Sequence, residues 1–449
     1  MRLTLSLLLV ITALTMRVAS DQTANASYLA LAAFALFGRA EAIQALGLSW
    51  LFSMLSLGVA PEASDASIGR FEVMAAAAVS VLLRSDVARG SMRVRWPVLA
   101  TLLLGAFFVL HSVLFSTIPS ISILKAVSWT VSTATLLAAW SSLATRDRSR
   151  LEMRLFGCLA GVLILSLPLL ALNIGYLRNG TGFQGILGHP QVFGPSMALL
   201  AAWLSGNLMR QPKPSWGWLL ILGGAMALVL ASEARTAGLA LLAGVPAAVL
   251  LSILCSHRRV REIVPGLASS RLLMAFLLVG VAFLNFGSAL ADRLRDFVQK
   301  RRDSASILEA YESSRGRLIS SMASNIEHSP LQGIGFGIAS EPSSMVVKRD
   351  PWLGLPVGAT IEKGVMPLAV LEELGIPGFL AVAAWVFMLL RRAGRGGIVS
   401  AAVLCTALFT NMGESTLLSP GGMGLLILIL ISWAGTARGE PHSTNSEHA

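Results

Sequence analysis

Apolar segments of about 15 to 25 residues follow one another along this chain, with short polar stretches between them. A helix rises about 1.5 Å per residue, so such segments can cross the ~30 Å hydrocarbon core of a bilayer. The pattern predicts spans at residues 3–19, 28–60, 71–83, 97–115, 118–143, 155–176, 190–209, 216–231, 236–255, 272–290, 365–390, 398–410 and 422–433. The stretch 28–60 suits two short spans folded back near Gly38, and 3–19 is either a first helix, which we favour, or a signal peptide. We predict an all-α polytopic membrane protein with about 12–14 transmembrane helices.

One polar interval, residues 291–364, is much longer than the others. Irregular backbone is not tolerated in the hydrocarbon, because its N–H and C=O groups would lack hydrogen-bond partners there. The interval therefore lies outside the membrane, as one large and mainly helical loop. It divides the chain into N-terminal helices over 1–290, the loop over 291–364, C-terminal helices over 365–434 and a cytoplasmic tail over 435–449.

The composition excludes several other classes of protein. With 55% hydrophobic residues, 13% charged residues and a mean hydropathy of +0.71, the chain is too apolar for a soluble globule. The net charge of +11 does not indicate a nucleic-acid partner, because Lys and Arg gather in short loops between apolar segments. Cys158, Cys255 and Cys405 lie inside apolar segments without C-x-x-C spacing, so we expect no disulfide, no metal and no other cofactor.

Basic loops orient the predicted helices. When the spans alternate, five loops rich in Lys and Arg fall on one side, which is the cytoplasm by the positive-inside rule. These loops contain Arg84, Arg89, Arg93 and Arg95; Arg146, Arg148 and Arg150; Arg210 and Lys213; Arg258, Arg259 and Arg261; and Arg391, Arg392 and Arg395. The long interval 291–364, the loop 177–189 and the turns 232–235 and 411–414 then face the other side, here called the outer face.

Two short loops of the outer face carry candidate binding residues. The loop 178–191 has four glycines between Arg178 and His189, and glycine lets backbone N–H groups approach a ligand closely. The alternative is an ordinary tight loop in which Arg178 is an interfacial anchor. Arg235 follows a very short turn between two apolar spans, where an unpaired charge is costly. It needs either a salt bridge to Glu233 or a bound anion, for which its fork of donors is well suited.

The long interval carries two more basic candidates. Apolar residues at spacings of three and four predict a helix over 304–327, with a break at Gly316. A serine just before Arg315 would cap a second helix, with Arg315 and Arg317 in its first turn. Basic residues there oppose the helix dipole unless an anion is bound, so they indicate an anion site. The alternative for Arg317 is a solvated surface charge.

Several of these segments together resemble the O-antigen ligase and O-antigen polymerase family. The similar pieces are Ser232–Thr236 in the form Ser-x-x-Arg-Thr, Ser314-Arg315 followed by Leu318-Ile319, Pro330-Leu331, Gly333-Ile334-Gly335-Phe336-Gly337, and Leu371-Glu372-Glu373-Leu374-Gly375-Ile376-Pro377-Gly378. The resemblance covers roughly residues 178–390, about half of the chain. Each piece is weak alone, and their order is more specific.

The resemblance implies an architecture similar to the C-type glycosyltransferases, in the bacterial inner membrane with a periplasmic active face. It implies transfer of a glycan from undecaprenyl pyrophosphate to an acceptor hydroxyl. The acceptor is a lipid A core sugar, the end of another repeat unit or a protein side chain. The partners expected are therefore the lipid-linked donor, one of these acceptors and membrane lipid, with no nucleic acid.

The resemblance also suggests roles for single residues. Arg178, Arg235 and Arg315 suit the stabilisation of a pyrophosphate leaving group without a metal, and Lys363 and Arg317 add positive charge. Of these, Arg235 and Arg315 match the family by position.

The general base is where the sequence departs from the family. The family's base is a His eleven residues before the glycine that is Gly375 here, but that position is Gly364. Glu362 or His189 is the candidate base instead. Glu373 matches the family acid and is expected to orient loop residues and not to perform chemistry. Gly335 and Gly337 are further supporting residues.

Two other function classes remain open. One is a transporter or flippase for an anionic lipid-linked glycan, although the apolar spans contain few charged residues besides Lys125. The other is a catalytically lapsed partner in polysaccharide assembly, which the missing His would explain.

Overall fold

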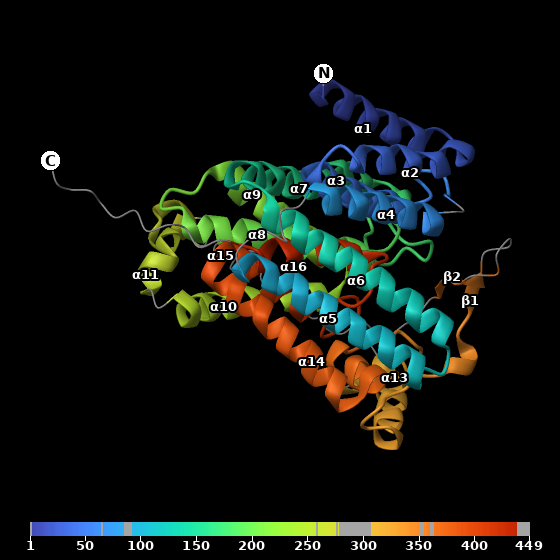
Figure 1. The fold of residues 1–449 in the computed structure, drawn as a ribbon. Helices are drawn as coiled ribbons and strands as arrows, with labels where there is room; N and C mark the ends of the chain where they lie inside the picture. The colour runs from blue at the N-terminus through green and yellow to red at the C-terminus, as the bar shows by residue number, and fades with distance from the viewer. Residues whose placement is uncertain are drawn as a thin grey trace.

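The computed structural model describes residues 2–63, 66–84, 92–256, 259–274, 277, 307–349, 354, 356–359 and 363–437, and it is mainly helical (Figure 1). The helices are α1 (Arg2–Ala19), α2 (Asp21–Ala35), α3 (Arg39–Met54), α4 (Ala66–Arg84), α5 (Met92–Phe115), α6 (Pro119–Ser142), α7 (Thr145–Ser166), α8 (Pro190–Arg210), α9 (Trp216–Ala231), α10 (Arg235–Ser256), α11 (Val260–Ile263), α13 (Ile307–His328), α14 (Met366–Gly396), α15 (Ile398–Thr410) and α16 (Met423–Gly435). Short 3-10 turns are η2 (Leu167–Ala171), η3 (Asn173–Gly175), η4 (Pro265–Ala268) and η5 (Pro342–Ser344). Two strands, β1 (Val347–Arg349) and β2 (Pro356–Ala359), form an antiparallel hairpin.

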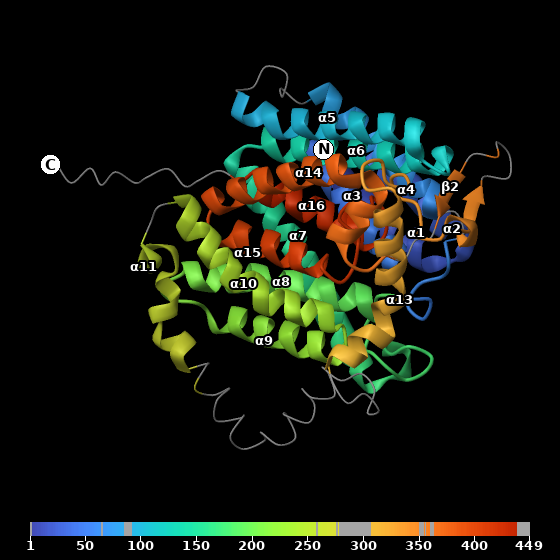
Figure 2. The same cartoon turned by 90° about the horizontal axis from the view of Figure 1, so that it is seen from below.

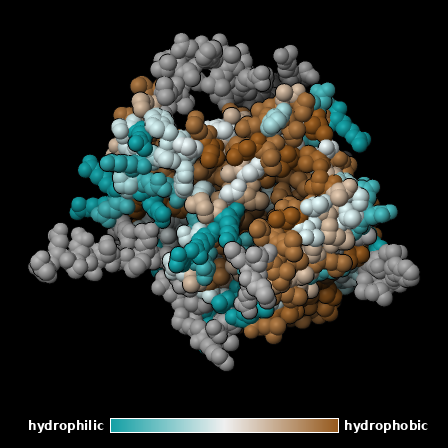
Figure 3. Space-filling view, turned by 90° about the horizontal axis from the view of Figure 1, so that it is seen from above, coloured by the Kyte–Doolittle hydropathy of each residue, from teal (hydrophilic) through white to brown (hydrophobic). Residues whose placement is uncertain are grey.

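Six helices within the described part of the chain are long and apolar enough to cross a membrane. They lie at Arg95–Phe115, Pro119–Ser142, Thr145–Ala171, Pro190–Arg210, Arg235–Ser256 and Met366–Gly396. Large apolar side chains are exposed around the bundle, among them Leu83 at 78% and Leu220 at 73%. Figure 3 shows such side chains covering a broad area of one face. These features confirm a helical chain with several potential membrane spans. The predicted span 272–290 lies mostly outside the described residues.

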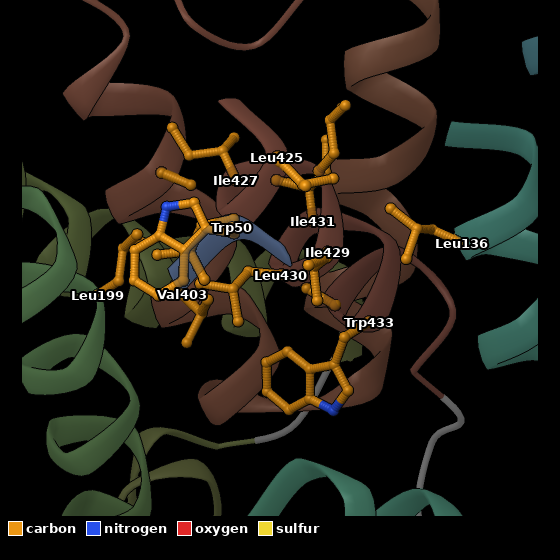
Figure 4. Close-up of a cluster of buried hydrophobic side chains, with 14 of the residues drawn as sticks. Trp50, Leu136, Leu199, Val403, Leu425, Ile427, Ile429, Leu430, Ile431 and Trp433 are labelled. Carbon is orange, nitrogen blue, oxygen red and sulfur yellow. The ribbon is translucent and has the colours of Figure 1, made fainter. Parts of the chain in front are cut away.

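The centre of the bundle is α16, in which every residue is buried. Figure 4 shows its Leu and Ile side chains among Trp50 of α3, Val403 of α15 and Leu199 of α8. With 13 residues, α15 and α16 are each about 20 Å long, shorter than the hydrocarbon core of a bilayer. Figure 2 shows α14, α15 and α16 between α5 and α6 on one side and α8 and α10 on the other.

Two predicted features of connectivity have clear outcomes. The fold-back near Gly38 is confirmed, because α2 ends at Ala35 and α3 begins at Arg39. The predicted helix break at Gly316 is wrong, because α13 continues through it. A glycine inside a helix costs only about 0.5–1 kcal/mol, so the residues on either side can maintain the helix. Arg315 and Arg317 therefore lie inside α13 and not in a first turn, and the helix-dipole argument for an anion beside them fails.

The described part of the long interval gathers at one end of the bundle. Figure 1 places α13 and the β1–β2 hairpin there, and α11 at the opposite end. The hairpin pairs Val347 with Ala359 and was not predicted, since the sequence indicated only helix in this loop. The N-terminal ends of α4, α6 and α14 point to the same end, so short loops between helices meet the long one there.

Candidate functional site

The long helix α14 is interrupted at Gly375, where φ is +63° and ψ is −173°. This conformation is open essentially to glycine, and a Cβ at this position would collide with the carbonyl oxygen of Leu331. Pro377 follows and has no N–H to donate to the preceding turn. The break therefore leaves the backbone carbonyls of Glu372 and Glu373 without their usual helical partners.

The loop that follows α13 supplies those partners. Ile334 N donates to Glu372 O at 2.9 Å, and Gly335 N donates to Glu373 O at 3.0 Å. In return, Ile376 N donates to Pro330 O at 2.9 Å. Gly335 has φ of +117°, and a Cβ there would lie 2.5 Å from Ser116 Oγ at the end of α5. The segment 330–337, here called the docking loop, thus completes the hydrogen bonding of the broken helix.

Two adjacent carboxylates are buried beside the break. Glu372 is fully buried and Glu373 is 7% exposed. Lys363 Nζ lies between them, 2.7 Å from Glu372 Oε2 and 3.0 Å from Glu373 Oε1. Both contacts are ion pairs by distance. The Lys363 side chain is only 2% exposed, so these charges attract each other with little screening by water.

Further hydrogen bonds hold each carboxylate in place. Asn325 Nδ2 of α13 donates to Glu372 Oε1 at 2.7 Å, and Ser340 Oγ donates to Glu372 Oε2 at 3.1 Å. Gly337 N donates to Glu373 Oε2 at 2.6 Å. Through this last contact the carboxylate of Glu373 binds the docking loop. Because both carboxylates are fully engaged, they are suited to fixing the loops in place and not to exchanging protons with a substrate.

Two neighbouring helices, α5 and α6, contact the docking loop from the other side. Lys125 Nζ of α6 donates to Gly337 O at 3.0 Å, and His111 Nε2 of α5 is hydrogen-bonded to Gln332 O at 2.6 Å. Phe336 stacks on Phe108 of α5, with ring centroids 4.5 Å apart. The docking loop is thereby fixed between α5, α6 and α14.

A chain of contacts extends from this cluster to the other loops at the same end. Ser415 N donates to Lys363 O at 3.2 Å, and Met366 N donates to Asn411 O at 3.0 Å. Gly413, in the same turn as Asn411, lies directly against the side chain of Thr236. The turns 232–235 and 411–414, which the sequence placed on one face, are therefore neighbours and connect to Lys363.

The glycine-rich loop joins the same assembly. Phe183 N donates to Ala231 O at 3.0 Å at the end of α9. His189 caps the N-terminus of α8, where its Nδ1 accepts from Gln191 N at 3.1 Å. Capping is a structural role, and a catalytic role for exposed His189 stays a prediction.

The predicted cationic residues differ in their surroundings. Arg178 is exposed, and Arg235 is half-buried as the first residue of α10. Arg315 and Arg317 are described only as backbone within α13, and Glu362 lies outside the described residues. Their proposed roles in binding and catalysis stay predictions. Lys363 differs from the arginines, because two carboxylates offset its charge.

Sequence reasoning missed four polar members of the cluster. Glu372 has the same local signal as Glu373, and Lys125 is a lone cation in an otherwise apolar helix. Both were named in the sequence but not assigned to the site, although a charge in an apolar span implies a partner. Asn325 and Ser340 carried no signal, because neither sits in an unusual local pattern.

Within the described ranges, no group of three His, Cys, Asp or Glu side chains is placed to hold a metal ion. Comparison of the sequence with protein-family models and with curated proteins gave no match.

Proposed function

We propose that this protein is a membrane glycosyltransferase that transfers or polymerises a saccharide from undecaprenyl pyrophosphate onto an acceptor hydroxyl, as an O-antigen ligase or polymerase does. In this proposal the chain has about 12–14 transmembrane helices in a bacterial inner membrane. The loop assembly at the end of the bundle faces the periplasm, and residues 291–364 form the large periplasmic loop. The acceptor is a lipid A core sugar, the end of a glycan or a protein side chain.

One observation carries the proposal most directly. Three segments that carry the family resemblance, 232–236, 333–337 and 371–378, are far apart in the sequence but belong to one connected assembly. The buried ion pairs of Lys363 with Glu372 and Glu373 lie at the centre of that assembly. A transferase needs such fixed geometry, because its leaving group and acceptor must be held within bonding distance.

The proposed reaction has two charge changes that the chain must support. The acceptor oxygen bonds to the anomeric carbon of the donor sugar as the bond from that carbon to the pyrophosphate oxygen breaks. The acceptor proton passes to Glu362, or to His189 as the alternative base. The departing pyrophosphate gains charge, which Arg235, Arg178 and Arg315 stabilise, with Arg317 in support. Lys363 contributes less to that stabilisation than a free cation would, since it neutralises buried carboxylates.

A cell-based test compares surface glycans of cells that lack the protein with cells complemented by wild type or by variants. Loss of ligated glycan with polymer retained on its carrier indicates a ligase, and single repeat units alone indicate a polymerase. We expect Arg235→Ala to lower transfer by about 100-fold or more, as for loss of one transition-state donor. Arg154→Ala, on α7, is the matched control and should keep wild-type transfer. Unchanged glycans in the deletion strain would refute the proposal.

A second candidate is a transporter or flippase for an anionic lipid-linked glycan. The interruption of α14 favours it, because transporters often use discontinuous helices whose broken region lies beside buried charges. The two functions separate in reconstituted vesicles. Transport moves the lipid-linked glycan across the bilayer intact, whereas transfer releases undecaprenyl pyrophosphate. A protein that does neither but is still required for assembly in cells would be a catalytically lapsed partner.

A further inference from the structure

A cavity of about 140 Å³ lies near the docking loop, outside the cluster of Lys363 with the two carboxylates. It is enclosed by α3, α4, α6, the strand β2, the turn 419–421 and the first residues of α16. Polar lining residues include Arg70 of α4 and Lys125, Ser128 and Ser132 of α6. Arg70 and Lys125 belong to the N-terminal parts of their helices, so the cavity lies at the same end of the bundle as the candidate site.

The charged residues that the structure describes in the lining of this cavity are both positive. Among the described residues, its lining includes Arg70 and Lys125 and no acidic residue. Behind Arg70, Tyr28 packs against Gly69, and Arg17 donates to Phe52 O and Pro61 O at 3.0 and 2.6 Å. Glu373, an acid whose charge acts on Lys125, is already paired with Lys363. Within the part of the chain that the structure describes, the cavity therefore concentrates positive charge without a counterion of its own.

Both cations keep hydrogen-bonding capacity. Arg70 Nε is buried and has no partner among the described residues. Lys125 Nζ has three N–H donors and gives one of them to Gly337 O. Gly421 leaves room for the guanidinium, since a Cβ there would lie 3.0 Å from Arg70 Nη1. Two partly buried cations with unused donors are costly unless an anion satisfies them.

We propose that this cavity binds a diphosphate group, with Arg70 and Lys125 as its principal ligands. Two cations balance the charge of a diphosphate better than that of a single carboxylate, and its several oxygens can accept from both residues. Leu46, Phe71 and Leu124 also line the cavity and suit the carbon chain of a lipid diphosphate. The identity of such a lipid rests on the proposed function, whereas binding of the diphosphate does not.

Lys125 connects the cavity to the carboxylates through one residue. It donates to Gly337 O at 3.0 Å, and Gly337 N donates to Glu373 Oε2 at 2.6 Å. A diphosphate that draws the Lys125 ammonium toward the cavity would therefore act on the docking loop. This link makes Arg70 the cleaner residue for a test, because its replacement leaves the docking loop contacts intact.

The test uses full-length protein in phosphatidylcholine nanodiscs and measures binding of inorganic pyrophosphate and, separately, of a polyprenyl diphosphate. We expect wild type to bind at least one probe and Arg70→Gln to weaken that binding about 10- to 100-fold, as for loss of a charged hydrogen bond. Arg70→Lys should keep part of the affinity. Arg84→Gln is the control, because Arg84 lies at the other end of α4 and bonds to Ser80 Oγ at 3.0 Å.

The outcomes separate the ligand sources and the two proposals. Binding of the polyprenyl probe alone assigns a lipid headgroup, whereas equal affinity for inorganic pyrophosphate assigns the free anion. Unchanged affinity in a folded Arg70→Gln variant, or no binding of either probe by wild type, overturns the cavity proposal. If binding behaves as expected but no transfer is found, the cavity stands and the proposed function fails. If Arg70→Gln keeps both full transfer activity and unchanged affinity, the proposed function stands and the cavity proposal fails.

Discussion

Replacing Lys363 by methionine tests whether the buried ion pairs hold the loop assembly together. The change keeps most of the side-chain volume but leaves Glu372 and Glu373 as adjacent buried carboxylates, which keep hydrogen bonds from Asn325, Ser340 and the backbone N–H of Gly337. Removing one partner of a buried pair costs about 3–5 kcal/mol. Because Lys363 is paired with two buried carboxylates, we expect the cost of Lys363→Met to fall within that range.

The charge balance predicts how a second substitution should behave. Glu372→Gln alone leaves Lys363 paired with Glu373 and places an amide where Asn325 and Ser340 both donate hydrogen bonds. We expect this substitution to lower the free energy of unfolding by about 1–3 kcal/mol. Lys363→Met combined with Glu372→Gln leaves a single carboxylate. Its cost should be lower than the sum of the two single substitutions, because the repulsion between the carboxylates is gone.

The assay is the thermal midpoint of the detergent-solubilised protein, read for all three variants and for Lys213→Met, an exposed residue of the α8–α9 loop. Lys363→Met should lower the midpoint by several degrees, and Lys213→Met should leave it unchanged. If Lys363→Met behaves like Lys213→Met, or if the double variant shows the full sum, then the ion pairs do not stabilise the assembly and the reasoning is refuted.

Two further predictions concern the same region. Gly375→Ala should destabilise the protein by more than about 1–3 kcal/mol, because the Cβ of alanine would collide with Leu331 O in the backbone conformation at the break. Gly161→Ala in α7, with open space around it, is the control and should be neutral or stabilising. The thermal midpoints of the two variants test this prediction. Asn325→Asp should destabilise the protein at pH 7 and do so less at pH 5. The new carboxyl group would lie about 2.7 Å from Glu372 Oε1 and can donate a hydrogen bond only when it is protonated. Equal shifts of the thermal midpoint at the two pH values would contradict this.

The sequence by itself determined the class of the fold. Runs of about 20 apolar residues can satisfy their backbone groups only within the run, so they become helices wherever they pack. The positions of α5, α6, α8 and α10 followed from that rule, and so did the fold-back between α2 and α3. Glu373 was placed near the start of a long helix for the same reason.

Only the tertiary structure decided how the polar residues combine. Nothing local pairs Lys363 with Glu372 and Glu373, and Asn325 is 47 residues from Glu372 in the chain. The break at Gly375 is satisfied by a loop about 40 residues earlier, and α13 continues through Gly316 despite its local signal for a break. Arg70 and Lys125 come from different helices to face one cavity.

The physical reason is the range of the interactions. The hydrogen bonding of a helix backbone and the transfer of its apolar side chains from water depend on residues within that one helix. A sequence pattern therefore indicates them directly. The pairing of buried charges depends on which helix ends meet and at what depth. Those relations arise from the packing of α5, α6, α13 and α14 as a group, and no single segment contains them.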